Sequence, residues 1–299
     1  MITYDFLNDS INIIALHRVL SDVDYDNRVA PVSIMEMAER DLVEFIKYSK
    51  NNGYEFISID DVLSLDVGTN NKCIVLTFDD GYVDFYDVVF PIIKEHRIPA
   101  CLYFTSGYPD SKCIHSFGIL EDHVRSLPSL KFSIANKDYS LRAETKSEKR
   151  EAIYFLSNLV EELCDGNDSG KLLEILKLIG VDDEIINRRY SLNWRQVIEL
   201  SNNELVTIGS HTVTHPRLSQ LKSQNVEFEL LESKRKLENV LGAEVKHFAY
   251  PYGDHNERVK AMVRKVGYSS AVTVISRDVC NIDRFALPRH WLDSDFAVI

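Results

Sequence analysis

Short apolar runs alternate with helix-patterned segments along most of the chain. The apolar runs predict strands at 11–16, 55–59, 73–78, 100–105, 205–208, 245–250, 271–275 and 285–287. Apolar residues at helical spacing predict helices at about 83–96, 194–200, 223–241 and 256–266, and a capping box of Ser33 and Glu36 predicts another that ends at Gly53. Such alternation is typical of βαβ units, so we expect an α/β fold with a parallel sheet or barrel.

The alternation breaks between residues 107 and 190, where we find no strongly apolar strand. Thr145 and Glu148 form a capping box at the start of one predicted helix, and a second helix is expected at 169–179. Loops after strands tolerate insertions. We therefore predict one domain over 1–299, with a helical insertion at about 107–190 that shapes access to a site.

The strand at 73–78 ends abruptly in Asp79, Asp80 and Gly81. Its apolar, β-branched residues are typical of a strand buried on both faces. A carboxylate at the end of such a strand is costly unless a metal or a reaction uses its charge. The simpler interpretation is a strand that stops at an Asp-Gly turn.

His211 and His215 follow the predicted strand at 205–208 and are four residues apart. Residues at this spacing share one face of a helical turn, so both imidazoles can reach one ion. Two imidazoles and one aspartate form an open three-ligand site of the kind that binds catalytic Zn²⁺. The second aspartate is then free to act as a general base. A surface loop with no ligand is the alternative for the histidine pair alone.

A third stretch, Tyr250-Pro251-Tyr252-Gly253, reads as a strand that ends in a tight turn. Together with the other two stretches it is a candidate groove wall, formed by Pro251 and Tyr252. A backbone N–H in this turn can face a developing oxyanion.

In this order, Thr77-Phe78-Asp79-Asp80-Gly81, Ser210-His211-Thr212-Val213-Thr214-His215 and Tyr250-Pro251-Tyr252-Gly253 resemble the first three motifs of the polysaccharide deacetylase family. This family is also called the NodB-homology family or carbohydrate esterase family 4. The resemblance extends from Ile13 to Trp291, with 107–190 outside it. It implies a distorted (β/α)7 barrel and metal-dependent hydrolysis of an N-acetyl group on an amino sugar.

The resemblance also implies roles for individual residues. Asp79 would be the general base, and the metal ligands would be Asp80, His211 and His215. The backbone N–H of Tyr252 would complete the oxyanion hole.

The chain departs from the family pattern in three places. Ala249 stands where the commoner third motif has an arginine that orients the catalytic aspartate, and we expect Arg289 to supply this guanidinium. His290 is the candidate general acid, although its surroundings in the sequence differ from the fifth motif. The fourth motif has no clear counterpart, and Asp278 and Asp283 are the candidates.

His17 ends the first predicted strand and is a further candidate to line the site, but not as a metal ligand. The sequence Leu16-His17-Arg18-Val19 resembles the start of one branch of the family. A packing or supporting role is the alternative for His290.

Composition limits the partners. The formal net charge of −12 argues against nucleic acid or an anionic membrane surface, and a neutral, sugar-like substrate fits better. Five cysteines without CxxC spacing are expected to be reduced thiols. The N-terminus has no signal-peptide pattern and no run reaches the length of a membrane span, so we expect a cytoplasmic protein unless a leader has been removed.

The sequence therefore predicts a hydrolase that uses Zn²⁺, with Co²⁺ or Ni²⁺ as alternatives, to deacetylate an N-acetylated glycan or sugar precursor. Two other functions stay open. One is a sugar-binding module on a decayed enzyme scaffold, because two of the five motifs are altered. The other is hydrolysis of a small cyclic amide or imide on the same scaffold.

Overall fold

A computed structural model describes residues 4, 6–30, 35–64, 72–134, 136–164, 169–186, 190–274 and 283–292. Within these ranges, no helix combines the length and the apolar character that crossing a membrane requires.

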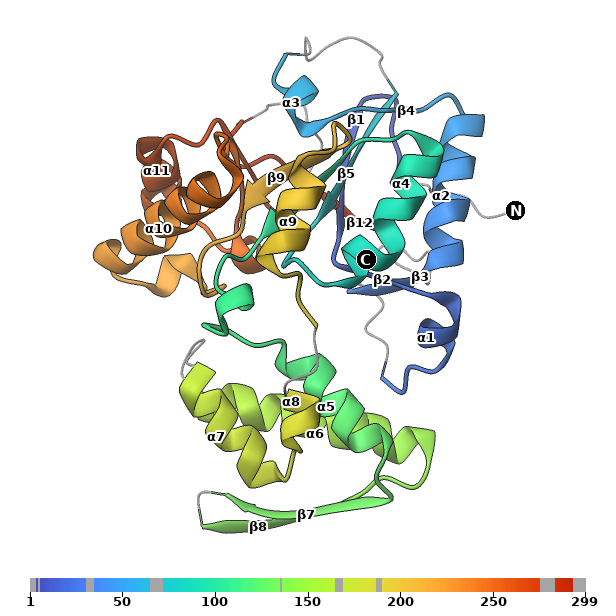
Figure 1. Ribbon diagram of the computed structural model, residues 1–299, viewed down its shortest axis with the longest axis vertical. Helices are drawn as coiled ribbons and strands as arrows, with labels where there is room; N and C mark the ends of the chain where they lie inside the picture. Colours follow the sequence, from blue (N-terminus) through green and yellow to red (C-terminus); the bar gives the residue numbers. More distant parts are fainter. Residues whose placement is uncertain are drawn as a thin grey trace.

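Eight strands of the described residues form one parallel sheet that curves into a barrel (Figure 1). Its order is β11 (Ser270–Val272), β10 (His247–Ala249), β9 (Val206–Ser210), β6 (Ala100–Phe104), β5 (Cys73–Phe78), β1 (Ile11–Leu16) and β12 (His290–Trp291), and β4 (Glu55–Phe56) also pairs with β5. Leu287 pairs with Val272 of β11, and His290 pairs with Ile14 of β1. The short segment 287–291 thus joins the two edges of the sheet, and the predicted distorted (β/α)7 barrel is confirmed.

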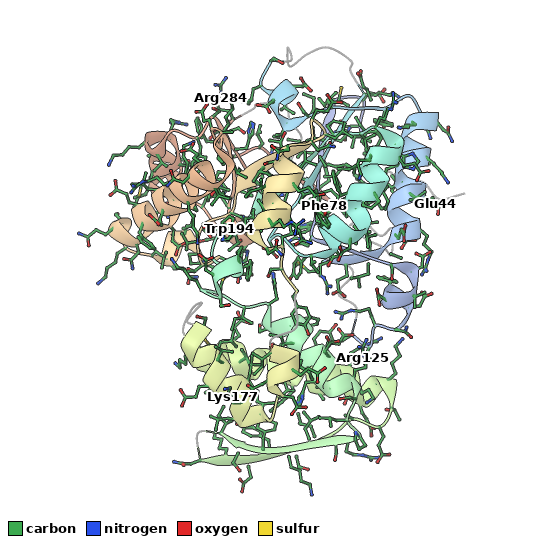
Figure 2. The ribbon with its side chains drawn as sticks, viewed as in Figure 1. Glu44, Phe78, Arg125, Lys177, Trp194 and Arg284 are labelled. Carbon is green, nitrogen blue, oxygen red and sulfur yellow. The ribbon has the colours of Figure 1, made fainter. Side chains whose placement is uncertain are left out.

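Helices cover the outer face of the sheet (Figure 1). They are α2 (Glu39–Asn51), α4 (Phe90–His96) with a π-helical turn before it (Phe85–Val89), α9 (Trp194–Ser201), α10 (Ser223–Leu241) and α11 (Glu257–Val266). Successive side chains along each strand point to opposite faces of the sheet and therefore belong to two different apolar cores. Phe78, labelled in Figure 2, belongs to the outer core between sheet and helices, whereas Ile13, Val75 and Tyr103 belong to the inner core of the barrel.

One predicted helix start was wrong. Glu36 lies in β3 (Glu36–Ala38), which pairs with β2 (Arg18–Leu20), and α2 begins only at Glu39. Ser33, the other half of the predicted capping box, lies outside the described residues. The physical reason is a tertiary contact, because the buried carboxylate of Glu36 forms ion pairs with two arginines. Two further short helices are α1 (Asp22–Asp26) and α3 (Ile59–Val62).

The insertion lies at one end of the barrel, at the bottom of Figure 1, and has an apolar cluster of its own. Its helices are α5 (Ser116–Arg125), α6 (Lys146–Leu163), α7 (Ser169–Ile179) and α8 (Asp183–Ile186). It also contains an antiparallel hairpin, β7 (Ser129–Ile134) with β8 (Lys137–Arg142), which the sequence analysis missed. Only alternate residues of β7 are buried, so the strand carries no continuous apolar run.

Candidate active site

Asp79 and Asp80 lie directly after β5, at the end of the barrel that faces the insertion, and both are buried. The chain turns sharply here, because Asp80 has φ 73° and Gly81 has φ 90°. A Cβ atom at Gly81 would come within 2.2 Å of the Phe104 ring, so only glycine fits. The turn lets the two neighbouring carboxylates point in different directions.

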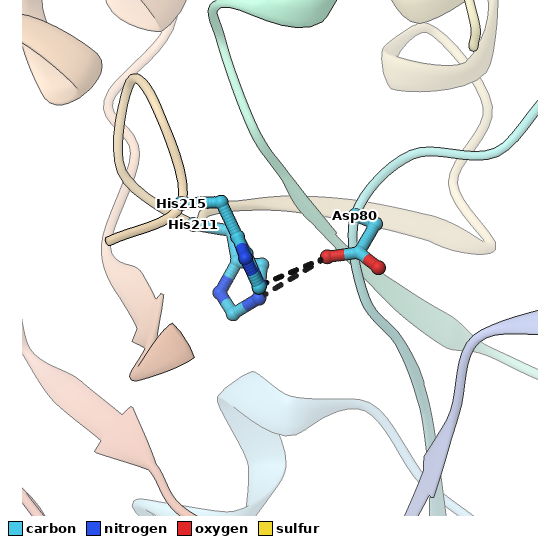
Figure 3. A group of neighbouring side chains, drawn as sticks. All are labelled: Asp80, His211 and His215. Atoms are coloured by element: carbon cyan, nitrogen blue, oxygen red, sulfur yellow. Dashed lines mark ion pairs between the residues drawn. The ribbon is translucent and has the colours of Figure 1, made fainter. Parts of the chain in front are cut away.

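Three side chains from two separate segments converge at this turn. Nε2 of His211 lies 3.5 Å from Oδ1 of Asp80, and Nε2 of His215 lies 3.3 Å from the same oxygen. Figure 3 shows both imidazoles pointing at this carboxylate. One ligand atom from each residue lies within 4.8 Å of the other two.

The arrangement fits a divalent transition-metal ion. Among the described residues, no group makes a hydrogen bond with the buried Oδ1 of Asp80. Nδ1 of His211 donates to the carbonyl of Ala249 at 2.8 Å, which leaves the Nε2 lone pair directed at the cluster. Burial lowers the pKa of both histidines, that of His215 to about 4, so the imidazoles are neutral ligands at neutral pH. Two nitrogens and one oxygen form a set that suits zinc and its neighbours.

A carboxylate on α10 holds the histidine loop in place. Glu229 accepts hydrogen bonds from the N–H of Val213 at 2.7 Å, the N–H of Thr214 at 3.0 Å and the Thr214 hydroxyl at 2.7 Å. The loop needs this support because Thr212 and His215 both have positive φ, 69° and 58°. The sequence analysis missed Glu229, since nothing in the pattern of a long amphipathic helix distinguishes it from its exposed neighbours.

Arg289 lies against Asp79, although the two residues are far apart in sequence. Its NH1 and NH2 groups donate to the two carboxylate oxygens at 2.7 and 2.6 Å. Its Nε donates to the Thr273 carbonyl at 3.1 Å, and the whole side chain is buried. Burial alone would raise the pKa of Asp79, but Arg289 and His211 hold that pKa well below its usual range, so Asp79 is ionised.

His17 also faces this group of charges. It follows β1 and stacks on the indole of Trp291 with 5.2 Å between ring centroids. Among the described residues, none forms a hydrogen bond with its buried Nδ1. Burial lowers the pKa of His17, while the charges of Asp80 and Asp79 act in the opposite direction.

Tyr252 forms an exposed rim beside the histidines. It lies in the 3-10 turn Pro251–Gly253 with φ 59°, and its ring centroid is 4.6 Å from that of His215. The guanidinium of Arg217 lies over the Tyr252 ring, 4.1 Å from its centroid. Pro251 is buried beneath the turn, so the predicted groove wall consists mainly of Tyr252.

The model of the family described as "Polysaccharide deacetylase" matches residues 66–165 and 178–271, which is more than half of the chain. The chain belongs to this family. The match includes all of 107–190 except residues 166–177, so the expectation that this segment lies outside the resemblance was wrong.

Several members of the polysaccharide deacetylase family are similar to this chain. The protein YxkH of Bacillus subtilis (strain 168) is 19% identical over 242 residues, which are 80% of this chain and 59% of that protein. The poly-beta-1,6-N-acetyl-D-glucosamine N-deacetylase of Escherichia coli (strain K12) is 23% identical over 190 residues, 62% of this chain and 19% of that protein. The chain thus spans less than two thirds of the length of these curated relatives.

Solved structures share the fold. The Streptococcus pyogenes deacetylase PplD in complex with acetate superposes with a TM-score of 0.61 at 18% identity, covering 96% of this chain and 93% of that one. The structure of IcaB from Ammonifex degensii gives a TM-score of 0.58 at 16% identity, covering 96% and 94%.

One residue expected from the polysaccharide deacetylase pattern does not face the site. His290 pairs in register with Ile14, which belongs to the outer core, and its ring stacks on Phe6 at 5.7 Å in that layer. Its neighbours Arg289 and Trp291 point to the inside because side chains alternate along a strand. The prediction of His290 as general acid is therefore not supported by its position.

Asp283, one of the two candidates for the fourth motif, is also not at the site. Asp283 accepts a hydrogen bond from Lys260 at 2.8 Å and one from the N–H of Phe285 at 2.9 Å, so it stabilises a turn near α11. Asp278 lies outside the described residues.

Proposed function

We propose that the barrel and its insertion act as one metal-dependent deacetylase domain that removes N-acetyl groups from the amino sugars of a glycan or glycan precursor. The observation that carries this proposal is the cluster of Asp80, His211 and His215 beside the ionised carboxylate of Asp79. A chitooligosaccharide deacetylase of Azorhizobium caulinodans, 34% identical over 61 residues (20% of this chain and 29% of that protein), supports the same substrate class.

Asp80, His211 and His215 would hold the ion, with Zn²⁺ proposed ahead of Co²⁺ and Ni²⁺. When bound, such an ion would polarise the acetyl carbonyl and lower the pKa of the attacking water. Three protein ligands leave coordination positions open for these groups.

Asp79 is the proposed general base. Its two hydrogen bonds from Arg289 keep it ionised and fix its orientation, so it can accept a proton from water. The same contacts lower its pKa and make it a weak base, which is why the reaction needs a water molecule that has itself become more acidic.

Two further groups would stabilise the oxyanion and protonate the leaving amine. The backbone N–H of Tyr252 is the proposed oxyanion donor, and the strained turn around it fixes its direction. His17 takes the place of His290 as the proposed proton donor to the leaving amine, because its ring faces the charges of Asp80 and Asp79. A lowered pKa makes its protonated form a stronger acid.

The acidic net charge and the exposed aromatic rim at Tyr252 support a neutral sugar rather than a polyanion. A cytoplasmic location stays a prediction.

Acetate release from N-acetylglucosamine oligomers, measured with and without a chelator, tests the function. We expect release that the chelator abolishes and added Zn²⁺ restores. Asp79→Asn should abolish turnover and keep the metal, whereas His211→Ala should lose both. A sugar-binding module would bind the oligomers without releasing acetate, and a cyclic amide or imide hydrolase would open ring substrates instead.

A further inference from the structure

A cavity of about 350 Å³ lies between the insertion and the barrel. One wall belongs to the segment that leads into the insertion and includes Tyr108, Cys113 and His115. The opposite wall belongs to the segment that returns from it and includes Tyr190 and Asn193. Its volume is within the range of small-ligand sites.

The entering wall is attached to the histidine half of the candidate active site. The N–H of Ser106 donates to the Thr212 carbonyl at 3.1 Å, and Sγ of Cys113 lies 3.7 Å from the Val213 carbonyl. A Cβ atom on Gly107 would come within 2.2 Å of that same carbonyl, so the backbones are in close contact.

The returning wall is attached to the carboxylate half. The N–H of Leu192 donates to the Gly81 carbonyl at 3.0 Å, and the N–H of Val83 donates to the Tyr190 carbonyl at 2.8 Å. Tyr82, which lies between these two bonds, stacks on His115 with 4.0 Å between centroids. Both walls of the cavity are therefore held against the loops that carry Asp80, His211 and His215.

The lining mixes apolar and hydrogen-bonding side chains and indicates an uncharged ligand with both kinds of surface. No aspartate, glutamate, lysine or arginine of the described part of the chain lines the cavity. His115 is 7% exposed, and its Nε2 makes no hydrogen bond with any described group. Burial keeps the pKa of His115 well below its usual value, so this nitrogen belongs to a neutral ring that can donate or accept one hydrogen bond. Ser111 adds a further polar group. The Asn193 side chain accepts a hydrogen bond from the N–H of Gln196, and the Tyr108 ring stacks on His115 with 3.8 Å between centroids.

Both walls are held rigidly. Arg28 joins the barrel to the insertion, because its NH2 group lies 2.6 Å from Oε1 of Glu36 in β3 and 2.6 Å from Oε2 of Glu121 in α5. The Tyr190 hydroxyl donates to Asp122 in α5 at 2.6 Å.

We propose that this cavity is a subsite for a neighbouring sugar ring of the glycan, so that the protein selects oligosaccharides over single sugars through its insertion. The inference rests on the proposed deacetylase function and extends it to chain length. The unsatisfied imidazole of His115 would bind a sugar hydroxyl.

Turnover of N-acetylglucosamine from monomer to tetramer tests the subsite. We expect kcat/KM to rise about tenfold or more with chain length, which is the contribution of one or two net hydrogen bonds. Ile186→Trp fills the cavity from α8 and should bring the tetramer-to-monomer ratio close to one. The matched control is Ile185→Trp, because this neighbour lines a separate cavity with Asp182 and Arg125 and should keep the ratio.

A binding measurement separates this inference from the proposed function. Asp79→Asn protein should bind the tetramer about tenfold more tightly than the monomer in calorimetry, without any turnover. His115→Gln is a second, smaller change that should also reduce the preference. Equal affinity for monomer and tetramer overturns the subsite, as does a full preference in both Ile186→Trp and His115→Gln. Absence of acetate release at every chain length would instead overturn the deacetylase function and leave the binding result to decide on the subsite.

Discussion

The guanidinium of Arg289 and the carboxylate of Asp79 form a bidentate ion pair in the interior of the barrel, and both residues are at most 3% exposed. The pair links the short C-terminal strand to the turn after β5, across 210 positions of sequence. It places a fixed, ionised carboxylate beside the cluster of Asp80, His211 and His215.

Arg289→Gln should both destabilise the fold and impair the reaction. Removing one partner of a buried ion pair leaves an uncompensated charge and typically costs about 3–5 kcal/mol. Chemical denaturation measures this cost. Arg289→Lys should recover only part of the activity, because an ammonium cannot form both parallel hydrogen bonds. The exposed Arg284→Gln is the control and should leave the unfolding curve unchanged.

The two histidines at the closure of the barrel should differ sharply in their effect on catalysis. His17→Gln removes the imidazole that faces Asp79 and Asp80, and the loss of an acid catalyst typically lowers kcat by about 10²–10⁴. His290→Gln changes a ring in the outer layer beside Phe6 and should leave kcat nearly unchanged. A larger loss of kcat in His290→Gln than in His17→Gln would reverse this assignment.

Glu229 should control how tightly the metal binds without touching it. Glu229→Ala removes all three hydrogen bonds that fix the loop around Thr214, and losses of such supporting contacts typically weaken metal affinity about 10–100-fold. Competition with a zinc chelator dye measures the change. Glu232→Ala on the same helix is the matched control. An unchanged zinc affinity in Glu229→Ala would show that the loop keeps its shape without this carboxylate.

His247 should make stability fall in mild acid. It is buried at the opposite end of β10, between the Ser270 hydroxyl at 2.8 Å and the Asp60 carboxylate at 3.1 Å. Burial lowers its pKa, although Asp60 partly opposes this effect. The unfolded chain therefore binds a proton more readily than the folded one, so stability is complete above the ordinary value of about 6.5 and declines as the pH falls through the folded pKa.

Unfolding free energies measured from pH 8 to pH 5 test this sign. One histidine contributes a slope of at most about 1.4 kcal/mol per pH unit, and His247→Gln should reduce the total slope by up to that amount. Other buried histidines contribute in the same direction, so the variant should retain part of the dependence. A slope that His247→Gln does not change would mean that this group has the same pKa in the folded and unfolded chain.

Arg28 should hold the insertion on the barrel. Arg28→Gln breaks buried contacts with Glu36 and Glu121, and we expect a loss of about 3–5 kcal/mol. Limited proteolysis should then cut the insertion more readily than in the parent protein. The exposed pair of Arg40 and Asp26 provides the control, because Arg40→Ala should leave both the stability and the cleavage pattern unchanged.

Much of the site could be predicted from the sequence because its residues follow predictable strands. Apolar runs at 73–78 and 205–208 identified the strands, and the carboxyl ends of parallel strands meet at one end of a barrel. This is why Asp80 and His211 could be assigned to one site from the sequence alone. The capping box of Thr145 and Glu148 was equally readable, since both of its hydrogen bonds are local.

Other features depended on contacts between distant parts of the chain. Glu36 was predicted to start a helix but lies in a strand, where two arginines pair with its buried carboxylate. The strand β7 was not predicted because it is apolar on one face only. Glu229 looks like any other acidic residue of a long helix until the histidine loop packs against it.

The sequence by itself determined the family, the parallel α/β architecture and the three candidate metal ligands that the fold brings together, because these follow from local patterns and their order. Only the tertiary structure decided which of two adjacent residues, Arg289 or His290, faces the site. The reason is the register of a two-residue strand, where a shift by one position exchanges the inside and the outside of the barrel.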